Sequence, residues 1–332
     1  MTYSDDLNVL LRGKQTAFKT AATAPTAIMQ NVSECSLDPE WEVPDSNKRQ
    51  GTMTPTGGES ITKIASSGSI ETSNETFEDI NYWLDSLFSE ATSSGSAAPF
   101  TREYAAPLSA NPSPAFMSLW WGQNGIFSRQ KDASVATFKM TASDNSGVNT
   151  SVSLVGGQVE KVTDPPALTV RTGQKEMTGC NTAVFIDAWT GTMGTTAIAL
   201  TAFAYELTVN SNRQTRGFLG ACDAAAIRDA RWDGQLKISM EVNDTSIPFI
   251  AEMLGAPNKM LEKQIQIKHF DGTGANLRET VVQFCGRTKQ PPKLFTDRDG
   301  VVAIDLVFDG AYNPTFGNWL KVQTKCGVKT LV

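Results

Sequence analysis

Few residues of this sequence have the type and spacing that catalysis or metal binding requires. The chain holds one histidine, His269, which follows Ile265 and Ile267 at alternate positions and so shares a strand face with them. A histidine-based hydrolase or a histidine-rich metal site would have to be built around this single imidazole. We therefore predict that His269 is a packed strand residue without a catalytic role.

The cysteines follow no metal-binding or disulfide spacing. They are odd in number and widely separated, without a C-x-x-C pair, at Cys35, Cys180, Cys222, Cys285 and Cys326. This pattern predicts free thiols in a reducing compartment. Cys285 alternates with Val281 and Gln283, so we expect a small packed side chain there.

Glycine-rich and aspartate-rich segments give no cofactor motif. The runs GTMGTT (191–196) and GTGAN (272–276) match neither phosphate-binding pattern, G-x-x-x-x-G-K-[ST] or G-x-G-x-x-G. FTDRDG (295–300) has some likeness to a calcium loop but lacks the later ligands and the closing glutamate. We read all three as turns and predict no catalytic, cofactor-binding or metal-binding residue, so the chain is not expected to be an enzyme.

Length and composition predict a globular protein of two domains. The chain has 332 residues, 40% hydrophobic and 19% charged, with a net charge of −6. That charge does not favour tight nucleic-acid binding, which needs a basic face. Residues 1–166 carry 11 basic and 19 acidic residues and the rest carry 18 and 16, so the two parts are −8 and +2. No basic, apolar leader or spanning apolar run is present, and we expect folding in a cytoplasm.

The most informative pattern is an internal repeat. Residues 61–88 align without a gap over residues 227–254, at an offset of 166, half the chain length. Both copies show an alternating stretch after a glycine, a polar turn and a short amphipathic helix. VATFKM (135–140) falls over VVAIDL (301–306) at the same offset. We predict a duplicated β-domain, with domains at 1–165 and 166–332 that meet at the Pro165-Pro166 pair.

The rest of the sequence consists of short segments with a strand pattern and long polar connections between them. Strands with one helix in each half predict a mainly β fold, a β-sandwich or partly closed barrel with a flanking short helix, present twice. The segments 44–60 and 210–226 hold equivalent places in the two halves, and each is predicted to be disordered or an extended loop that becomes ordered on a partner. Adjacent tryptophans, Trp120 and Trp121, must face opposite sides of a strand; one needs a cover, either a second subunit or a loop.

The order of these segments resembles the tube proteins of long-tailed phages. The resemblance rests on GKQTAFKTAATAPTA, IASSGSIETSNETFEDINYWLDSLF, FKMTASDNSGVNTSVSLVGGQVEKVTDPP and AVFIDAWTGTMGTTAIALTAFAYELTVNSN, which together span nearly the whole chain. It implies two tandem tail-tube-like domains whose sheets join around a ring, with long loops reaching adjacent rings. A single-domain tube protein needs six copies per ring, so a fused duplicate implies a trimeric, pseudo-sixfold ring.

The same resemblance implies a structural role in the virion tail. The stacked tube would conduct the tape-measure protein and the genome without binding them tightly, would meet terminator and baseplate proteins, and would assemble in the bacterial host cytoplasm. An acidic wall suits a DNA conduit, and unequal charge on the two halves could attract them to each other around the ring. Alternatives are another tail ring component, such as a terminator or baseplate protein, or an adhesive, carbohydrate-binding β-sandwich. The residues expected to contact neighbouring rings are Pro44, Asp45, Asn47, Lys48, Arg49, Asn210, Asn212, Arg213 and Arg216, with Trp120 and Trp121 as candidates for a subunit contact.

Overall fold

The computed structural model describes residues 8–331 except 44–60, 124, 145, 164, 166–167, 169, 199–200, 220, 255–259, 291–292 and 299. We call the part from β1 to β9 the first half and the part from β10 to β19 the second half. The first half contains β1 (Val9–Lys14), β2 (Ala27–Ile28), β3 (Val32–Glu42), β4 (Lys63–Thr72), α1 (Ile80–Leu87), β5 (Phe100–Ala105), β6 (Met117–Gln123), β7 (Ile126–Ser143), β8 (Asn149–Gly156) and β9 (Val159–Val162).

The second half contains β10 (Thr182–Ala188), β11 (Ala202–Asn210), β12 (Gln214–Phe218), β13 (Ala221–Arg228), β14 (Asp233–Glu241), α2 (Ile247–Leu254), β15 (Glu262–Asp271), β16 (Arg278–Arg287), β17 (Lys293–Arg298), β18 (Val301–Gly310) and β19 (Leu320–Cys326). The protein is mainly β, as predicted, and its described strands do not close into a barrel. Neither α1 nor α2 has the length and apolar run that a membrane-crossing helix needs.

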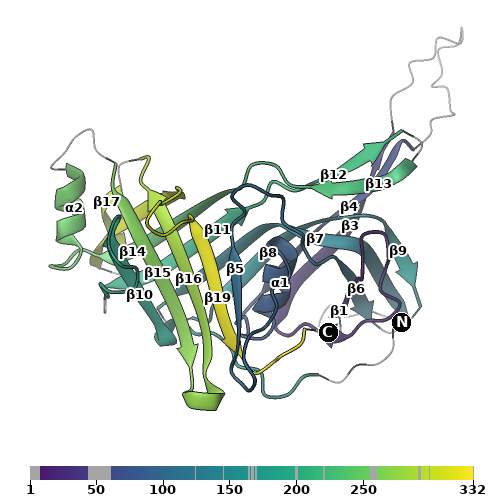
Figure 1. Cartoon of the computed structure of the whole chain (residues 1–332), viewed down its shortest axis with the longest axis horizontal. Helices are drawn as coiled ribbons and strands as arrows, with labels where there is room; N and C mark the ends of the chain where they lie inside the picture. The colour runs from purple at the N-terminus through teal and green to yellow at the C-terminus, as the bar shows by residue number, and fades with distance from the viewer. Residues whose placement is uncertain are drawn as a thin grey trace, which may run out of the picture.

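One continuous sheet runs through both halves. Its strands follow one another as β3, β4, β8, β7, β11, β14, β18 and β17, each antiparallel to the next. Two small sheets pack behind it. The first is β2-β1-β6-β7-β9, which shares the long strand β7, and the second is β10-β15-β16-β19-β5. Figure 1 shows α2 and β17 at one end of the molecule and β3, β4, β12 and β13 reaching away at the other.

Alternation along the strands sets the two faces of the continuous sheet. In β14, Gly234, Leu236, Ile238 and Met240 are buried, while the residues between them are exposed or half-buried. β4 follows the same rule with Gly68, Ile70 and Thr72 inward. The inward side chains of both halves join one hydrophobic core with the small sheets and α1. The other face of the sheet is left polar.

The helices begin where the polar turns end. In the first half, Thr76 Oγ1 accepts a hydrogen bond from the Asp79 amide at 3.0 Å, just before α1. In the second half, Asn243 Oδ1 accepts from the amides of Thr245 and Ser246 at 3.0 and 3.3 Å, just before α2. All eight residues of α1 are buried, whereas Ile247 in α2 remains 49% exposed.

The strand pairings of the first half recur in the second. The pairs β1–β6, β3–β4, β4–β8, β6–β7 and β7–β9 have counterparts in β10–β15, β11–β14, β14–β18, β15–β16 and β16–β19. The long β7 corresponds to β16 together with β17. The offset of 166 aligns the buried positions of β4 and β14, and it aligns α1 with α2 to within one residue.

The proposed continuation of that register is wrong. Residues 135–140 lie in β7, which β8 separates from β4, whereas residues 301–306 lie in β18, directly beside β14. The strand equivalent to β18 is therefore β8, at a different offset. The two short runs resemble each other only in composition. Any strand with one buried face alternates buried and exposed side chains, so such strands have similar sequences.

The halves are firmly joined to each other. Besides the β7–β11 pairing, β5 of the first half adds an edge to the second small sheet through β19. The chain between the halves packs on the start of α1, where the Phe77 amide donates to Lys175 O at 2.9 Å and the Met177 amide donates to Glu75 O at 2.8 Å. An ion pair between Arg278 and the buried Glu78, 2.7 Å between Nε and Oε1, adds to this contact.

Candidate functional site

His269 is a structural residue of the core. It is fully buried, with Nδ1 at 2.7 Å from Thr182 Oγ1 and Nε2 at 2.6 Å from Tyr205 Oη. The Thr182 hydroxyl donates to Thr178 O, so it can accept from an Nδ1–H, and the Tyr205 hydroxyl then donates to Nε2. Burial lowers the pKa of His269 to about 3, so the imidazole stays neutral. This geometry agrees with the predicted packed histidine.

The other chemically reactive residues do not converge. The five cysteines are free thiols, and Cys285 is buried in the core. Among the described residues, no three or more His, Cys, Asp or Glu side chains gather as metal ligands. Residues 295–298 lie in β17, which pairs with β18, and the Gly300 amide before β18 donates to Asp297 Oδ1 at 2.9 Å. The candidate functional features of the described residues are therefore surfaces of the molecule.

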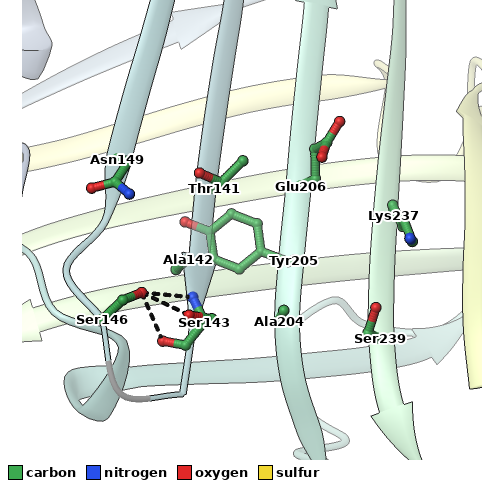
Figure 2. Close-up of a pocket in the computed structure, with 10 residues that line it drawn as sticks. All are labelled: Thr141, Ala142, Ser143, Ser146, Asn149, Ala204, Tyr205, Glu206, Lys237 and Ser239. Atoms are coloured by element: carbon green, nitrogen blue, oxygen red, sulfur yellow. Dashed lines mark hydrogen bonds between the residues drawn. The ribbon is translucent and has the colours of Figure 1, made fainter. Parts of the chain in front are cut away.

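The polar face of the continuous sheet is the first of these surfaces. Short hydroxyl side chains dominate its middle strands, at Ser69, Ser151, Ser153, Thr137, Thr141, Thr208 and Ser239. Where the two halves meet, the face holds a shallow hollow of about 250 Å³. Figure 2 shows the lining side chains from β7, β8, β11 and β14, which include the Tyr205 ring as well as short polar groups, with Ser146 bound to Ser143 at the rim.

Charge on this face is mildly acidic, and its lysines are paired. Lys139 Nζ lies 3.1 Å from Glu206 Oε1, and Lys237 Nζ lies 3.0 Å from Asp305 Oδ2. Glu71 and Asp309 add further carboxylates on β4 and β18. Cations already held by carboxylates attract phosphates less than free ones do. The face therefore presents hydroxyls and net negative charge without a free basic cluster in the described strands.

Two edges of the continuous sheet are unpaired within the described chain. β3 pairs with β4 alone and β17 with β18 alone, so each has one edge open. Gly68 and Gly234 occupy the same place in the two halves, and this aligns Glu34–Asp38 of β3 with Glu206–Asn210 of β11, which pairs with β7. Pro39 comes one residue beyond that part. A proline without an amide donor suits an edge that ends there.

The predicted inter-ring residues fall into different environments. Pro44, Asp45, Asn47, Lys48 and Arg49 lie outside the described residues. Their counterpart, 210–226, is not an irregular loop, because β12 and β13 pair there as a hairpin that also meets β4 in parallel at Asp223 and Ile64. Asn210 and Asn212 both bind Asp233, at 2.9 Å each, and Arg216 is exposed on β12.

The structure corrects the prediction that Arg213 contacts a neighbouring ring. Its side chain is fully buried, and its guanidinium donates to the Ser86 and Leu87 carbonyls at the end of α1 at 2.7 and 3.0 Å. It also pairs with Asp229, 2.5 Å between Nε and Oδ1. A guanidinium enclosed in this way joins the two halves of one chain and is not available to a neighbouring ring.

Trp120 and Trp121 face opposite sides of β6, as expected for adjacent strand residues. Trp120 is 2% exposed and packs with Leu11 and Phe127, with the Arg129 guanidinium 5.8 Å from its ring centre. Trp121 is half-buried and packs against the main core. The chain itself thus covers Trp120, while a subunit contact through Trp121 stays a prediction.

Sequence reasoning did not single out the open edges or a second hollow beside Tyr312 and Trp319. Pro39 inside an otherwise regular strand was an available signal for an edge. No sequence pattern indicated the hollow, because its walls come from several segments: β14, β18 and the residues beside them.

Comparison with known proteins agrees with this surface-based description. A family model described as a phage tail tube protein matches residues 6–310. A search of curated proteins finds no significant match.

Proposed function

The chain belongs to the phage tail tube protein family, and on this basis we propose that it is a subunit that joins head to tail into closed rings. The rings stack into the hollow tube of a long phage tail. The subunit is structural and performs no catalysis.

One observation carries the proposal: the β7–β11 joint inside the chain has an open counterpart at each end of the molecule. The first half offers β7 to β11 of the second half. The corresponding strands, β17 in the second half and β3 in the first, have free edges. Pairing β17 of one copy with β3 of the next repeats the internal joint, and such a head-to-tail contact closes into a ring when its rotation divides a full turn.

The internal joint also gives the register of the proposed one. Thr141 pairs with Glu206 across β7–β11. Thr141 corresponds to Lys293, because both lie opposite equivalent positions of β8 and β18, Asn149 and Asp305. Glu206 corresponds to Glu34 by the β11–β14 and β3–β4 pairings. The joint therefore brings Glu34 of one copy opposite Lys293 of another.

The polar face of the continuous sheet suits the wall of the lumen. The opposite face of the sheet packs on the core, so only this face can line a channel. Its carboxylates repel the DNA backbone, its lysines are engaged by Glu206 and Asp305, and its hydroxyl side chains are short. Such a wall lets the tape-measure protein and the genome pass without tight binding.

We further propose that the two halves arose by duplication and that three copies, with six halves, complete each ring. The recurring strand pairings support the duplication, and the family resemblance supports six halves. Terminator and baseplate proteins would close the two ends of the tube during assembly in the bacterial host.

Electron microscopy of the purified chain tests this function. We expect closed rings with six similar lobes, a mass of three copies, and stacking into tubes as concentration rises. A chain that stays monomeric at high concentration, with tail initiator proteins present, would contradict the proposal. Rings that never stack would instead favour a terminator or baseplate ring protein.

A further inference from the structure

A second hollow lies beside the base of the β12–β13 hairpin, at the corner of the continuous sheet where β14 begins and β18 ends. It measures about 730 Å³. Trp319 forms part of its wall and lies against Gly234 and Gly310, where an added Cβ would come within 2.5 and 2.6 Å of the indole. Tyr312 stands 54% exposed at the side. The two glycines thus make room for the Trp319 indole, which is 8% exposed and packs in the core, so Tyr312 is the exposed aromatic side chain of the hollow.

The first half has the same corner, and there it is covered. β4 and β8 correspond to β14 and β18, and the β12–β13 hairpin of the second half lies over them, with Asp223 beside Ile64. Ala65 is 1% exposed there. Within one chain, therefore, the extension of one half covers the corner of the half before it.

The first half carries an extension at the same point, and nothing in the described chain covers its exposed apolar side. β3 and β4 continue as a paired ribbon to Glu42 and Lys63, beyond the part of β11 and β14 that stays paired. Trp41, 64% exposed, lies on the same side of β3 as the core residue Leu37. In a head-to-tail ring this ribbon points at the second half of the preceding copy.

The charged groups of the two surfaces allow one further contact. Asp38, Glu40 and Glu42 lie on the side of β3 opposite Trp41, and Glu42 already pairs with Lys63 at 2.8 Å. In the hollow, Lys289 pairs with Asp309 at 3.3 Å, whereas Arg231 is exposed and forms no ion pair with a described residue. Arg231 is therefore a cation at the rim of the hollow that can meet a carboxylate at the edge of the ribbon.

We propose that the hollow beside Tyr312 and Trp319 is the docking site for the end of the β3–β4 ribbon of a second copy of this chain, with Trp41 against the exposed ring of Tyr312. This inference rests on the proposed ring and adds a second contact to it, outside the edge-strand pairing. It also gives the two halves different roles. The β12–β13 hairpin of the second half contacts the first half of the same chain, whereas the β3–β4 ribbon of the first half contacts another copy.

Cross-linking between two chains that each carry one introduced cysteine tests the docking site. One chain carries Trp41→Cys and the other Tyr312→Cys, both in a Cys180→Ser, Cys222→Ser background because those two native thiols are exposed. The two are assembled together and treated with a short bismaleimide, so that any mixed product must join two copies. The matched control replaces Tyr312→Cys with Phe270→Cys, another exposed aromatic position, at the far end of β15.

We expect a mixed cross-link at least tenfold more abundant than with the control. If microscopy shows rings but the yield equals that of the control, the docking site is wrong while the proposed function stands. If neither rings nor cross-links form, the proposed function and the proposed docking site are both wrong. Because both cysteines replace exposed side chains, loss of folding should not confuse the result.

Discussion

An Arg213→Ala variant should lose about 3–5 kcal/mol of unfolding free energy, the usual cost of breaking a buried ion pair from one side. Arg213 is fully buried and bridges Asp229 to the end of α1. Its loss leaves the Asp229 carboxylate, 6% exposed, with the Trp232 indole at 3.0 Å as the one remaining hydrogen-bond donor from the described residues. It also leaves the Ser86 and Leu87 carbonyls without their guanidinium donor. Urea denaturation of the unassembled chain measures the change.

Two further variants decide whether the cost comes from the buried charge. Arg216→Ala removes an exposed arginine three residues away and should change the free energy of unfolding by less than about 0.5 kcal/mol. The double variant Arg213→Ala, Asp229→Ala should recover part of the loss, because no unpaired carboxylate remains. If Arg213→Ala and Arg216→Ala were equally stable, Arg213 would not hold the two halves together.

A Glu75→Gln variant should become more stable than the native chain as pH rises. Glu75 is fully buried, accepting from Thr150 Oγ1 at 2.5 Å and from the Thr76 amide at 3.0 Å, and burial raises its pKa to about 8. Between the ordinary value of 4.5 and that pKa, the folded chain keeps a proton that the unfolded chain releases. The stability from this proton is fully present below pH 4.5 and is lost as pH rises through 8.

Glutamine stays neutral, so its variant does not suffer this loss. The advantage of Glu75→Gln should grow by up to about 1.4 kcal/mol per pH unit within the window and level off above pH 9. Denaturation midpoints at pH 5, 7 and 9 measure it, with the exposed carboxylate variant Glu71→Gln as control. A difference between Glu75→Gln and the native chain that did not vary with pH would show that Glu75 is ionised in the folded protein.

Much of the fold followed from the sequence where local pattern and burial agree. The alternation around Gly68 and Gly234 and the helices after them were predicted because one face of each element must enter the core. The packing of His269 was predicted for the same reason, since it continues the line of Ile265 and Ile267. The predicted β architecture is confirmed by the structure.

Features that depend on tertiary pairing could not be predicted. The sequence of residues 210–226 lacks the alternation that is typical of a strand. Strands β12 and β13 form there nevertheless, because their hairpin also pairs with β4 of the other half. Arg213 looked like a surface cation because its partners, Asp229 and the end of α1, come together only in the folded chain. The open edges likewise exist only once all other strands have found their neighbours.

A disulfide between the two open edges tests head-to-tail assembly most directly. A chain with Glu34→Cys and Lys293→Cys, in the Cys180→Ser, Cys222→Ser background, is assembled and oxidised, since paired strands bring Cα atoms within disulfide range. We predict a reducible ladder on a denaturing gel that ends at three copies, and little product when Asp297→Cys replaces Lys293→Cys four residues out of register. Rings that yield no ladder, or equal ladders from both pairs, would contradict a joint between β3 and β17.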